Sequence, residues 1–515
     1  MSNNTISEVV KIRRRVYTEL VKLELEDKLA ENIEDIPRKL ANDETPRHRC
    51  CEFKERAIIR DRIKLALGFN PVKHPETPLS ELVNRLNEVK TDHNAVKVLE
   101  RACDSCPIDK YMVTDACRNC VAHKCVNACP KDAIVIIQNR AFIDQNKCIE
   151  CGRCADVCPY NAINENKRPC VRACAVDAIT SDEDRRAEID DDSCVNCGSC
   201  IIACPFGAID YVSYIVQVIK SLKNNEKEIV ALLAPSFMGQ FGVRVKAEMV
   251  KKALKEIGFT EVIEVAYGAD RVIEEESEEF LERMEKDKDV MTTSCCPAFT
   301  ELIDQHYPEM KDYVSTTPSP MIKTADYIKK KYSKAETVFI GPCIAKKAEA
   351  SEHKNVDYVL TFEELVSIMV GYGINLENMN KGQKLKDASK LGRSFPYSGG
   401  VSGAIESYLK KKDIKVDNYK FETAKGLNDC KEKLETIKKD EAEFSFLEGM
   451  GCEEGCVGGP GNLVKAVVAK KLAENFAQKA DEELPAAEKN HSEKGFLEEE
   501  IKRNKEKKKM REIIG

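Results

Sequence analysis

The sequence lacks the features that would place it in several common classes of protein. No apolar run is long enough to cross a bilayer, which excludes a membrane-spanning chain. Positive charge is not in excess, because 81 Lys and Arg stand against 88 Asp and Glu, so nucleic acid is disfavoured as the main partner. The N-terminus also lacks the apolar core of a signal peptide. We therefore expect a cytoplasmic protein with no membrane or nucleic acid partner.

Cysteine, in contrast, is abundant, with 24 among 515 residues. In a long cytoplasmic chain, closely spaced cysteines indicate metal or redox chemistry, whereas the alternative is a disulfide-rich secreted protein. The length also allows two or more domains, each with a sizeable core. The positions of the cysteines therefore guide the interpretation of the chain.

The first 95 residues carry no recognisable cofactor motif. Apolar spacing predicts a helix over residues 9–23 and further helix over 82–99. The arginine run at 13–15 is interpreted as a solvated helix face, with a docking patch as the alternative. We interpret the adjacent cysteines at 50–51 as buried or structural thiols, because neighbouring cysteines rarely share one cubane, and a ligand role is the alternative.

The middle of the chain has the cysteine spacing of bacterial ferredoxins. Segments 148–159 and 194–205 both read C-x2-C-x2-C-x3-C-P, in which three cysteines bind one 4Fe–4S cluster and the fourth reaches its neighbour. Segment 117–130 has a wider middle gap, and segments 103–106 and 170–174 contribute two cysteines each. Zinc also accepts four thiolates, but this repeated spacing favours iron–sulfur clusters.

One ferredoxin module inserted within another accounts for all of these cysteines. The inner module would bind one cluster through Cys117, Cys120, Cys125 and Cys158, and another through Cys148, Cys151, Cys154 and Cys129. The outer module would bind one cluster through Cys103, Cys106, Cys170 and Cys204, and another through Cys194, Cys197, Cys200 and Cys174. Four redox centres in a row have no obvious use other than electron transfer, so we predict an electron relay of four 4Fe–4S clusters.

From about residue 216 the pattern changes to alternating strands and helices. Strands are predicted at 229–234, 261–265, 337–340, 358–361 and 443–446, and helices at 245–257 and 274–285. This succession indicates parallel sheets covered by helices. The predicted organisation is an α-helical region (1–95), an α+β ferredoxin-like domain (96–215), an α/β domain (216–475) and a charged helical tail (476–515).

Three loops of the α/β region carry cysteines. They are TSCCPAF at 293–299, GPCIAKKAE at 341–349 and FLEGMGCEEGCVGGPG at 446–461. The glycines of the third loop allow its backbone to wrap closely around a bulky group. Loops that follow separate parallel strands can converge. Four thiolates for a fifth cubane would then come from Cys296, Cys343, Cys452 and Cys456.

These loops resemble the signatures of the iron-only (FeFe) hydrogenases, which run approximately TSCCPxW, MPCxxKKxE and ExMxCxxGCxxGGG. The resemblance covers roughly residues 100–470. It implies that the four cysteines bind the cubane of an H-cluster, and that Cys456 bridges this cubane to a two-iron subsite with CO, cyanide and a dithiolate. It further implies reversible H2 oxidation and proton reduction, with ferredoxin or a similar carrier as electron partner and maturation proteins that load the subsite.

The resemblance also implies roles for single residues. Cys295 would exchange protons with the bridging amine, and Lys346 would point its ammonium at one cyanide. A buried inert thiol and a solvated charge are the respective alternatives. Contacts to the subsite would come from Pro235, Ser236, Phe395 and Met450, for which ordinary core packing is the alternative.

A proton route follows by position from the same resemblance. Glu276 and Glu279 match the relay carboxylates of the family, Ser315 its relay serine and Arg283 its nearby arginine. Carboxylates three residues apart share a helix face and can pass protons through hydrogen bonds. The acidic run over 274–279 makes a solvated face the alternative.

Some positions depart from the commonest family pattern. Phe299, Gly341 and Met321 stand where tryptophan, methionine and glutamine are usual, as in a branch similar to the monomeric clostridial-type enzymes. Two other functions stay open. One is a hydrogenase-like iron–sulfur assembly or scaffold protein, against which Cys295 and Lys346 argue. The other is an H2 sensor without high turnover, although we recognise no output module.

Overall fold

The computed structural model describes residues 6–485, with the exception of residues 43, 90, 105, 107–109, 225–226, 287–289 and 381. Most of the predicted charged tail, from residue 486 onward, lies outside the described residues. The last described helix, α19 (Ala466–Ala477), runs past the boundary predicted at residue 475. None of the described helices has the length and apolarity needed to cross a lipid bilayer.

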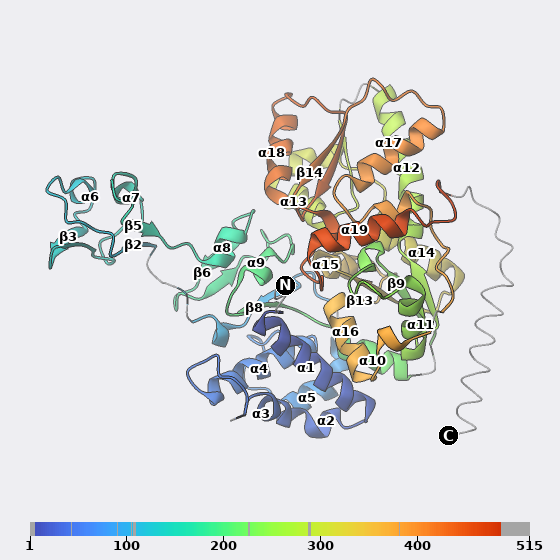
Figure 1. Cartoon of the computed structure of the whole chain (residues 1–515), viewed down its shortest axis with the longest axis horizontal. Coiled ribbons are helices and arrows are strands. Elements are labelled where there is room, and N and C mark those ends of the chain that lie inside the picture. The colour runs from blue at the N-terminus through green and yellow to red at the C-terminus, as the bar shows by residue number, and fades with distance from the viewer. Residues whose placement is uncertain are drawn as a thin grey trace.

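Helices form the N-terminal region, which lies below the rest of the molecule in Figure 1. They are α1 (Glu8–Leu25), α2 (Leu29–Asn32), α3 (Ile36–Leu40), α4 (Glu52–Ala66) and α5 (Leu79–Asn84). Helix α1 confirms the helix predicted over 9–23. The helix predicted over 82–99 is wrong beyond residue 88, because Val96–Val98 is a strand, β1, that pairs with the distant β8 (Ile209–Tyr211).

The arginine run of α1 contains a buried ion pair. Arg13 is 4 % exposed, and its guanidinium donates hydrogen bonds of 2.9 Å to Asp210 of β8 and to Glu363 of α16 (Phe362–Gly371). Both the solvated-face and the docking-patch interpretations are therefore wrong for Arg13. This side chain joins the N-terminal region to the two parts that follow.

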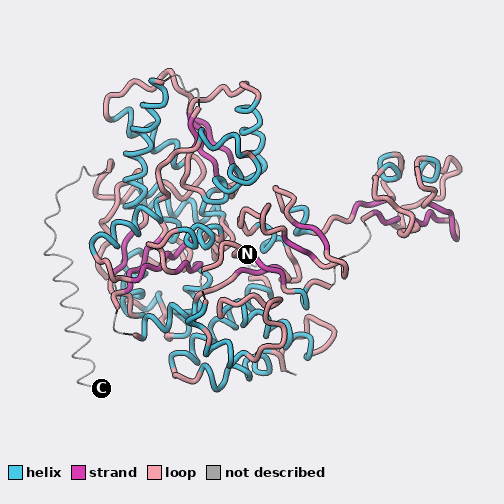
Figure 2. Tube along the Cα trace, turned by 180° about the vertical axis from the view of Figure 1, so that it is seen from behind, coloured by secondary structure: helices cyan, strands magenta, loops and turns pink. Residues whose placement is uncertain are grey.

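The cysteine-rich middle of the chain forms two small modules, one inserted into the other. In the outer module β1 pairs with β8, and β6 (Ile179–Ser181) pairs with β7 (Ala187–Ile189). In the inner module β2 (Tyr111–Val113) pairs with β5 (Ile163–Glu165), and β3 (Ile134–Ile137) pairs with β4 (Arg140–Ile143). The short helices are α6 (Lys124–Asn127), α7 (Arg153–Asp156), α8 (Pro169–Ala173) and α9 (Ser199–Ala203). The inner module projects from the molecule as an arm (Figures 1 and 2).

Two parallel sheets form the α/β body, as predicted. The first has the order β10 (Glu261–Glu264), β9 (Ile229–Leu233), β12 (Glu336–Gly341) and β13 (Tyr358–Thr361). The second has the order β11 (Met291–Thr292), β15 (Phe446–Met450) and β14 (Phe421–Lys425). The strand predicted at 443–446 is misplaced, because β15 begins at Phe446. The strand includes Gly449, and glycine is depleted in strands, so the sequence did not indicate its true extent.

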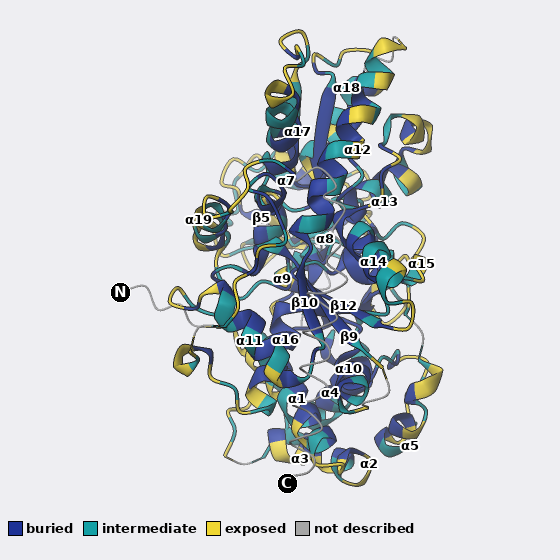
Figure 3. Cartoon of the chain, turned by 90° about the vertical axis from the view of Figure 1, so that its right-hand side faces the viewer, coloured by how far each residue is buried: buried dark blue, intermediate teal, exposed yellow. Residues whose placement is uncertain are grey.

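Helices cover both sheets, and strands β9, β10, β12 and β15 are almost wholly buried (Figure 3). The first sheet packs against α11 (Ala247–Ile257), α14 (Pro320–Lys331) and α16. The second packs against α13 (Pro297–His306), α17 (Gly400–Lys411) and α18 (Leu427–Lys438). Helix α12 (Ala266–Glu285) contacts helices of both layers and thus spans the junction between the sheets. α10 (Ile215–Lys223) packs on α1, and α15 (Ala345–Glu352) follows β12.

Candidate metal-cluster sites

The three cysteine loops meet at the junction of the two sheets. The first follows β11, the second follows β12 and the third follows β15, so all leave the carboxyl ends of parallel strands. The backbone N–H of Gly451 donates to Cys296 Sγ at 3.3 Å and joins the first loop to the third. Local chain direction at each strand end thus brings residues more than 150 positions apart into one site.

The four predicted cubane thiols are buried together. Burial raises the pKa of Cys452, and the nearby thiols of Cys343, Cys296 and Cys456 raise it further. Burial also raises the pKa of Cys456 to about 12. Burial also raises the pKa of Cys343, so these three thiols resist ionisation without a partner cation, whereas a bound metal cluster would stabilise their thiolates. The donor set therefore fits a cubane.

Ser236 and Lys346, the two polar residues predicted to contact the cyanides, are both buried. Ser236, in the short helix that follows β9, is 1 % exposed, and its hydroxyl has no hydrogen-bond partner among the described residues. A buried hydroxyl without a partner is costly, and a polar ligand atom would satisfy it. Lys346 is also buried and donates to Ser319 Oγ at 2.9 Å and to Glu349 Oε2 at 2.6 Å. The solvated-charge alternative is therefore wrong for Lys346.

Apolar side chains close the pocket around Cys295. Cys295, Phe395 and Met450 belong to one buried cluster, while Pro235 is only partly buried at the end of β9. The main-chain oxygen of Cys295 accepts a 3.3 Å hydrogen bond from Lys346 Nζ. Burial raises the pKa of the Cys295 thiol well above its ordinary value, as do Glu276 and Glu448, so this thiol keeps its proton at neutral pH.

Three of the predicted proton-route residues, Glu276, Glu279 and Arg283, lie on α12, and Ser315 packs beside them. We call this set of four side chains the proton ladder. Glu276 is fully buried, and its Oε1 accepts hydrogen bonds of 3.3 Å from the backbone N–H and the hydroxyl of Ser294. Burial raises the pKa of Glu276 to about 8, although hydrogen bonds from Ser294 and Ser315 oppose the shift. The solvated-face alternative is therefore wrong for Glu276.

The outer half of the ladder reaches the surface. Ser315 Oγ donates to Glu279 Oε2 at 2.7 Å, and Arg283 Nη2 donates to Glu279 Oε1 at 2.6 Å. Burial would raise the pKa of Glu279, but hydrogen bonds from Ser315, Thr316 and Arg283 outweigh it and lower the pKa. The ladder thus runs from a carboxyl that binds its proton tightly to a carboxylate that releases it.

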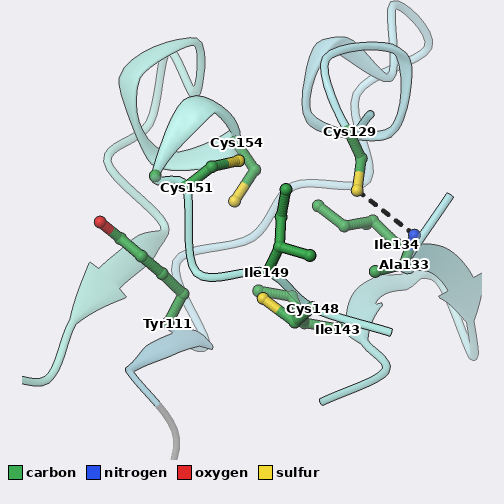
Figure 4. A pocket seen from close by; sticks show the side chains of 10 residues that line it. Tyr111, Cys129, Ala133, Ile134, Ile143, Cys148, Ile149, Cys151 and Cys154 are labelled. Carbon is green, nitrogen blue, oxygen red and sulfur yellow. Dashed lines mark hydrogen bonds between the residues drawn. The ribbon is translucent and has the colours of Figure 1, made fainter. Parts of the chain in front are cut away.

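The sixteen ferredoxin-type cysteines also lie in groups. Cys129, Cys148, Cys151 and Cys154 line one small cavity in the arm (Figure 4), and Cys174, Cys194, Cys197 and Cys200 line a similar cavity in the outer module. Burial raises the pKa of Cys170 to about 11, with contributions from Cys204, Cys103 and Cys106. Burial likewise raises the pKa of Cys125, with contributions from Cys120 and Cys158. These neighbours are the ones that the inserted-module pairing predicts.

One ferredoxin loop touches the loops of the H-cluster region. Cys197 is among the thiols that raise the pKa of Cys452. Gly198 has φ of +78°, and a Cβ at this position would lie 2.8 Å from Pro460 Cγ and 3.1 Å from Ile344 Cγ1. A glycine is therefore needed for this close approach. The Cys194–Cys200 loop is the ferredoxin segment next to the third cysteine loop.

Several residues near the site escaped the sequence reasoning. Lys347 is fully buried, and its ammonium pairs with the Glu364 carboxylate at 3.2 Å. The two adjacent lysines at 346–347 indicated positive charge but not this buried ion pair. Glu448 accepts hydrogen bonds from the backbone N–H groups of Gly399 and Ser402 inside the body. Cys50 is exposed and Cys51 only partly buried, so burial is wrong as the explanation for Cys50.

Three segments of the chain match known protein families. Residues 227–460 match the C-terminal domain of the iron only hydrogenase large subunit. Residues 141–164 match a 4Fe-4S binding domain, and residues 168–208 match a 4Fe-4S dicluster domain. The first segment contains the four predicted cubane cysteines, and the other two carry the ferredoxin spacing.

Individual relatives extend these matches. Over 383 residues the chain is 31 % identical to the periplasmic [Fe] hydrogenase large subunit of Nitratidesulfovibrio vulgaris, which covers 64 % of this chain and 88 % of that protein. The chain belongs to the iron-only hydrogenase family. It is also 28 % identical over 423 residues to iron hydrogenase 1 of Clostridium pasteurianum, which covers 69 % of this chain and 72 % of that protein. A more distant relative is the cytosolic Fe-S cluster assembly factor narfl of Xenopus tropicalis, 21 % identical over 314 residues, or 48 % of this chain and 66 % of that protein.

Membership of the iron-only hydrogenase family confirms the resemblance predicted from the loops, and with it an H-cluster domain preceded by 4Fe–4S binding domains. The structure also accommodates two departures from the usual family sequence. The Phe299 ring lies 2.4 Å from where a Cβ at Gly449 would be, so this glycine makes room for it. The Phe339 ring lies 2.5 Å from where a Cβ at Gly341 would be, so it occupies space that a larger side chain at 341 would need.

Proposed function

We propose that this protein catalyses the reversible oxidation of H2 to protons and electrons. The observation that carries this proposal is that four thiols converge next to Cys295, whose thiol lies near the buried carboxyl of Glu276, while Ser315, Glu279 and Arg283 form a hydrogen-bonded set closer to the surface. When bound, the H-cluster would supply the metal centre at which protons and electrons combine. Cys296, Cys343 and Cys452 would hold its cubane, and Cys456 would hold the fourth corner and bridge to the two-iron subsite.

The residues around the subsite would fix its ligands and exclude water. Lys346 would hold one cyanide by charge, and the unpartnered hydroxyl of Ser236, with Pro235 beside it, would face the other. Phe395 and Met450 would keep the pocket apolar. An apolar surrounding strengthens each of these electrostatic contacts.

Protons would move between the site and the surface along side chains of the protein. Cys295 would hold a proton on Sγ and exchange it with Glu276, whose pKa of about 8 suits exchange at neutral pH. Ser315 would connect Glu276 to Glu279 through its hydroxyl. Arg283 would hold Glu279 ionised, so that this carboxylate collects protons near the surface.

Electrons would pass through four 4Fe–4S clusters to or from ferredoxin or a similar carrier. Contact between the Cys194–Cys200 loop and the third cysteine loop supports entry to the H-cluster at this point. The arm would then carry the clusters farthest from the body (Figure 1). Five cubanes and a two-iron subsite amount to about 22 iron atoms per chain.

Infrared spectra of protein produced together with the maturation proteins test this function. We expect absorption bands of CO and cyanide, and H2 production from a reduced carrier. An assembly or scaffold protein, the function named for the distant relative, would contain iron but show neither bands nor H2 production. An H2 sensor would show the bands with very slow turnover.

A further inference from the structure

We propose that His93, Glu301 and Glu352 form a binding site for one Zn²⁺ ion, separate from every cysteine site. The three side chains can place one ligand atom each within 4.8 Å of one another. They come from distant segments, since His93 precedes β1, Glu301 lies in α13 and Glu352 ends α15. An imidazole and two carboxylates form a donor set that zinc accepts in proteins.

The distance between His93 and Glu301 fits a shared ion. His93 Nε2 lies 3.4 Å from Glu301 Oε1, longer than the ~2.9 Å typical of an N–H···O hydrogen bond. Two ligands of a tetrahedral zinc ion, each bound at about 2.0–2.2 Å, are separated by roughly 3.4 Å. Glu352 lies 3.2 Å from His93 Nδ1, on the other side of the ring, and its side chain is 58 % exposed. To bind an ion held at Nε2, Glu352 would have to leave Nδ1, and its oxygen lies within 4.8 Å of the other two ligand atoms.

A neighbouring amide already orients the central carboxylate. Gln305 Nε2 donates to Glu301 Oε2 at 2.8 Å, which leaves Oε1 directed toward His93. Partners of this kind fix the orientation of metal ligands and raise affinity. The Glu301 side chain is only 15 % exposed, and burial raises its pKa, so a nearby cation would be favoured over an unpaired carboxylate.

A zinc ion at this position would connect segments that lead to the predicted cubane cysteines. Helix α13 begins directly after Cys296, and α15 begins two residues after Cys343. The segment of His93 is fastened to the outer module, because Ala95 N–H donates to Asn196 Oδ1 at 3.0 Å, inside the Cys194–Cys200 loop. A zinc ion would therefore join the loop nearest the H-cluster region to the two helices that follow cubane cysteines.

Zinc binding to the full chain, with its iron–sulfur clusters in place, tests this proposal. After treatment with a chelator, we expect the protein to bind one Zn²⁺ per chain in equilibrium dialysis, with nitrogen and oxygen ligands in zinc-edge X-ray absorption. H93A and E301Q should weaken the affinity at least tenfold. H353A, which removes an exposed histidine next to Glu352, should bind zinc as the unaltered protein does.

The design separates the proposed site from accidental binding. Iron content and cluster spectra that match those of the unaltered protein show that each variant is folded and loaded. Sulfur ligands at the zinc edge would place the ion in a cysteine site and overturn the proposal. Equal affinity in H93A and the unaltered protein, or no binding at all, would overturn it as well.

Discussion

The arm and the α/β body hold cysteine groups in opposite ways. In the arm each group comes from short loops within about forty residues, and Cys151 is exposed to solvent. In the body the group comes from three loops spread over 160 residues, and burial raises the pKa of both Cys452 and Cys343. A centre that exchanges electrons with a carrier must lie near the surface, whereas one that performs chemistry gains from exclusion of water. Under the proposed function, the cysteine groups of the arm would serve the electron relay and the group in the body would serve catalysis.

Removal of the bridging thiolate tests the body most severely. We expect C456A to reduce H2 production to background, because no other thiol among the described residues is placed to join the cubane to the two-iron subsite. The four ferredoxin-type clusters should keep their electron paramagnetic resonance signals. C430A is the matched control, since Cys430 is buried near Cys296 but outside the predicted ligand set. Retained H2 production in C456A would contradict the assigned ligands.

The proton ladder predicts the next largest effect. We expect E276Q to lower the rate of H2 production about 10²–10⁴-fold, the usual contribution of a positioned proton-transfer group. E275Q should change the rate little, because Glu275 lies one residue away on the same helix and its side chain is 45 % exposed. Similar losses in both variants would contradict a relay through Glu276.

The same carboxyl gives a pH signature in stability. Because burial raises the pKa of Glu276 from 4.5 to about 8, the folded state binds more protons than the unfolded state between these values. The contribution of Glu276 is complete below pH 4.5 and is lost as pH rises toward 8. Denaturant unfolding between pH 5 and 8 should therefore show a smaller loss of stability in E276Q than in the unaltered protein.

A change in the arm should leave catalysis itself intact. We expect C151A to lower the iron content by up to four atoms per chain and to slow ferredoxin-coupled H2 production about tenfold. Turnover with a small chemical dye that reaches inner clusters directly should change less. C50A should have neither effect, because Cys50 is exposed but lies outside the predicted groups. Equal losses with both electron donors would mean that the arm is not part of the electron path.

The contact between relay and body predicts the smallest effect. We expect G198A to destabilise the fold by ~1–3 kcal/mol, because its Cβ would require a strained backbone and would meet Pro460. G403A should be neutral or slightly stabilising, since a Cβ there meets nothing within 4 Å in helix α17. Thermal unfolding of both variants measures the difference.

The sequence predicted most of what depends on local spacing. The cysteine groups of the ferredoxin-like modules are close along the chain, and the strand that precedes the second cysteine loop is apolar throughout its predicted residues 337–340 apart from Thr337. Pairings over long distances were missed. Strand β1 forms by pairing with β8, and Arg13 is buried because it pairs with Asp210 and Glu363. These partners are distant in sequence, so the residues around β1 and Arg13 do not indicate them. Most of β15 was not predicted, because Gly449 is disfavoured in strands. The glycine is present because a larger residue at 449 would collide with the Phe299 ring.

The two ends of the arm lie side by side. Strand β2 begins the inner module and β5 ends it, and Asn166 N–H donates to the carbonyl of Lys110 where they meet. A segment whose ends adjoin can be gained or lost without disturbing its host, as in domain insertions. The arm could therefore be deleted as a unit. A chain in which residue 110 is joined directly to residue 166 would still contain both strand pairs of the outer module. The length of the electron relay could in this way change independently of the catalytic body.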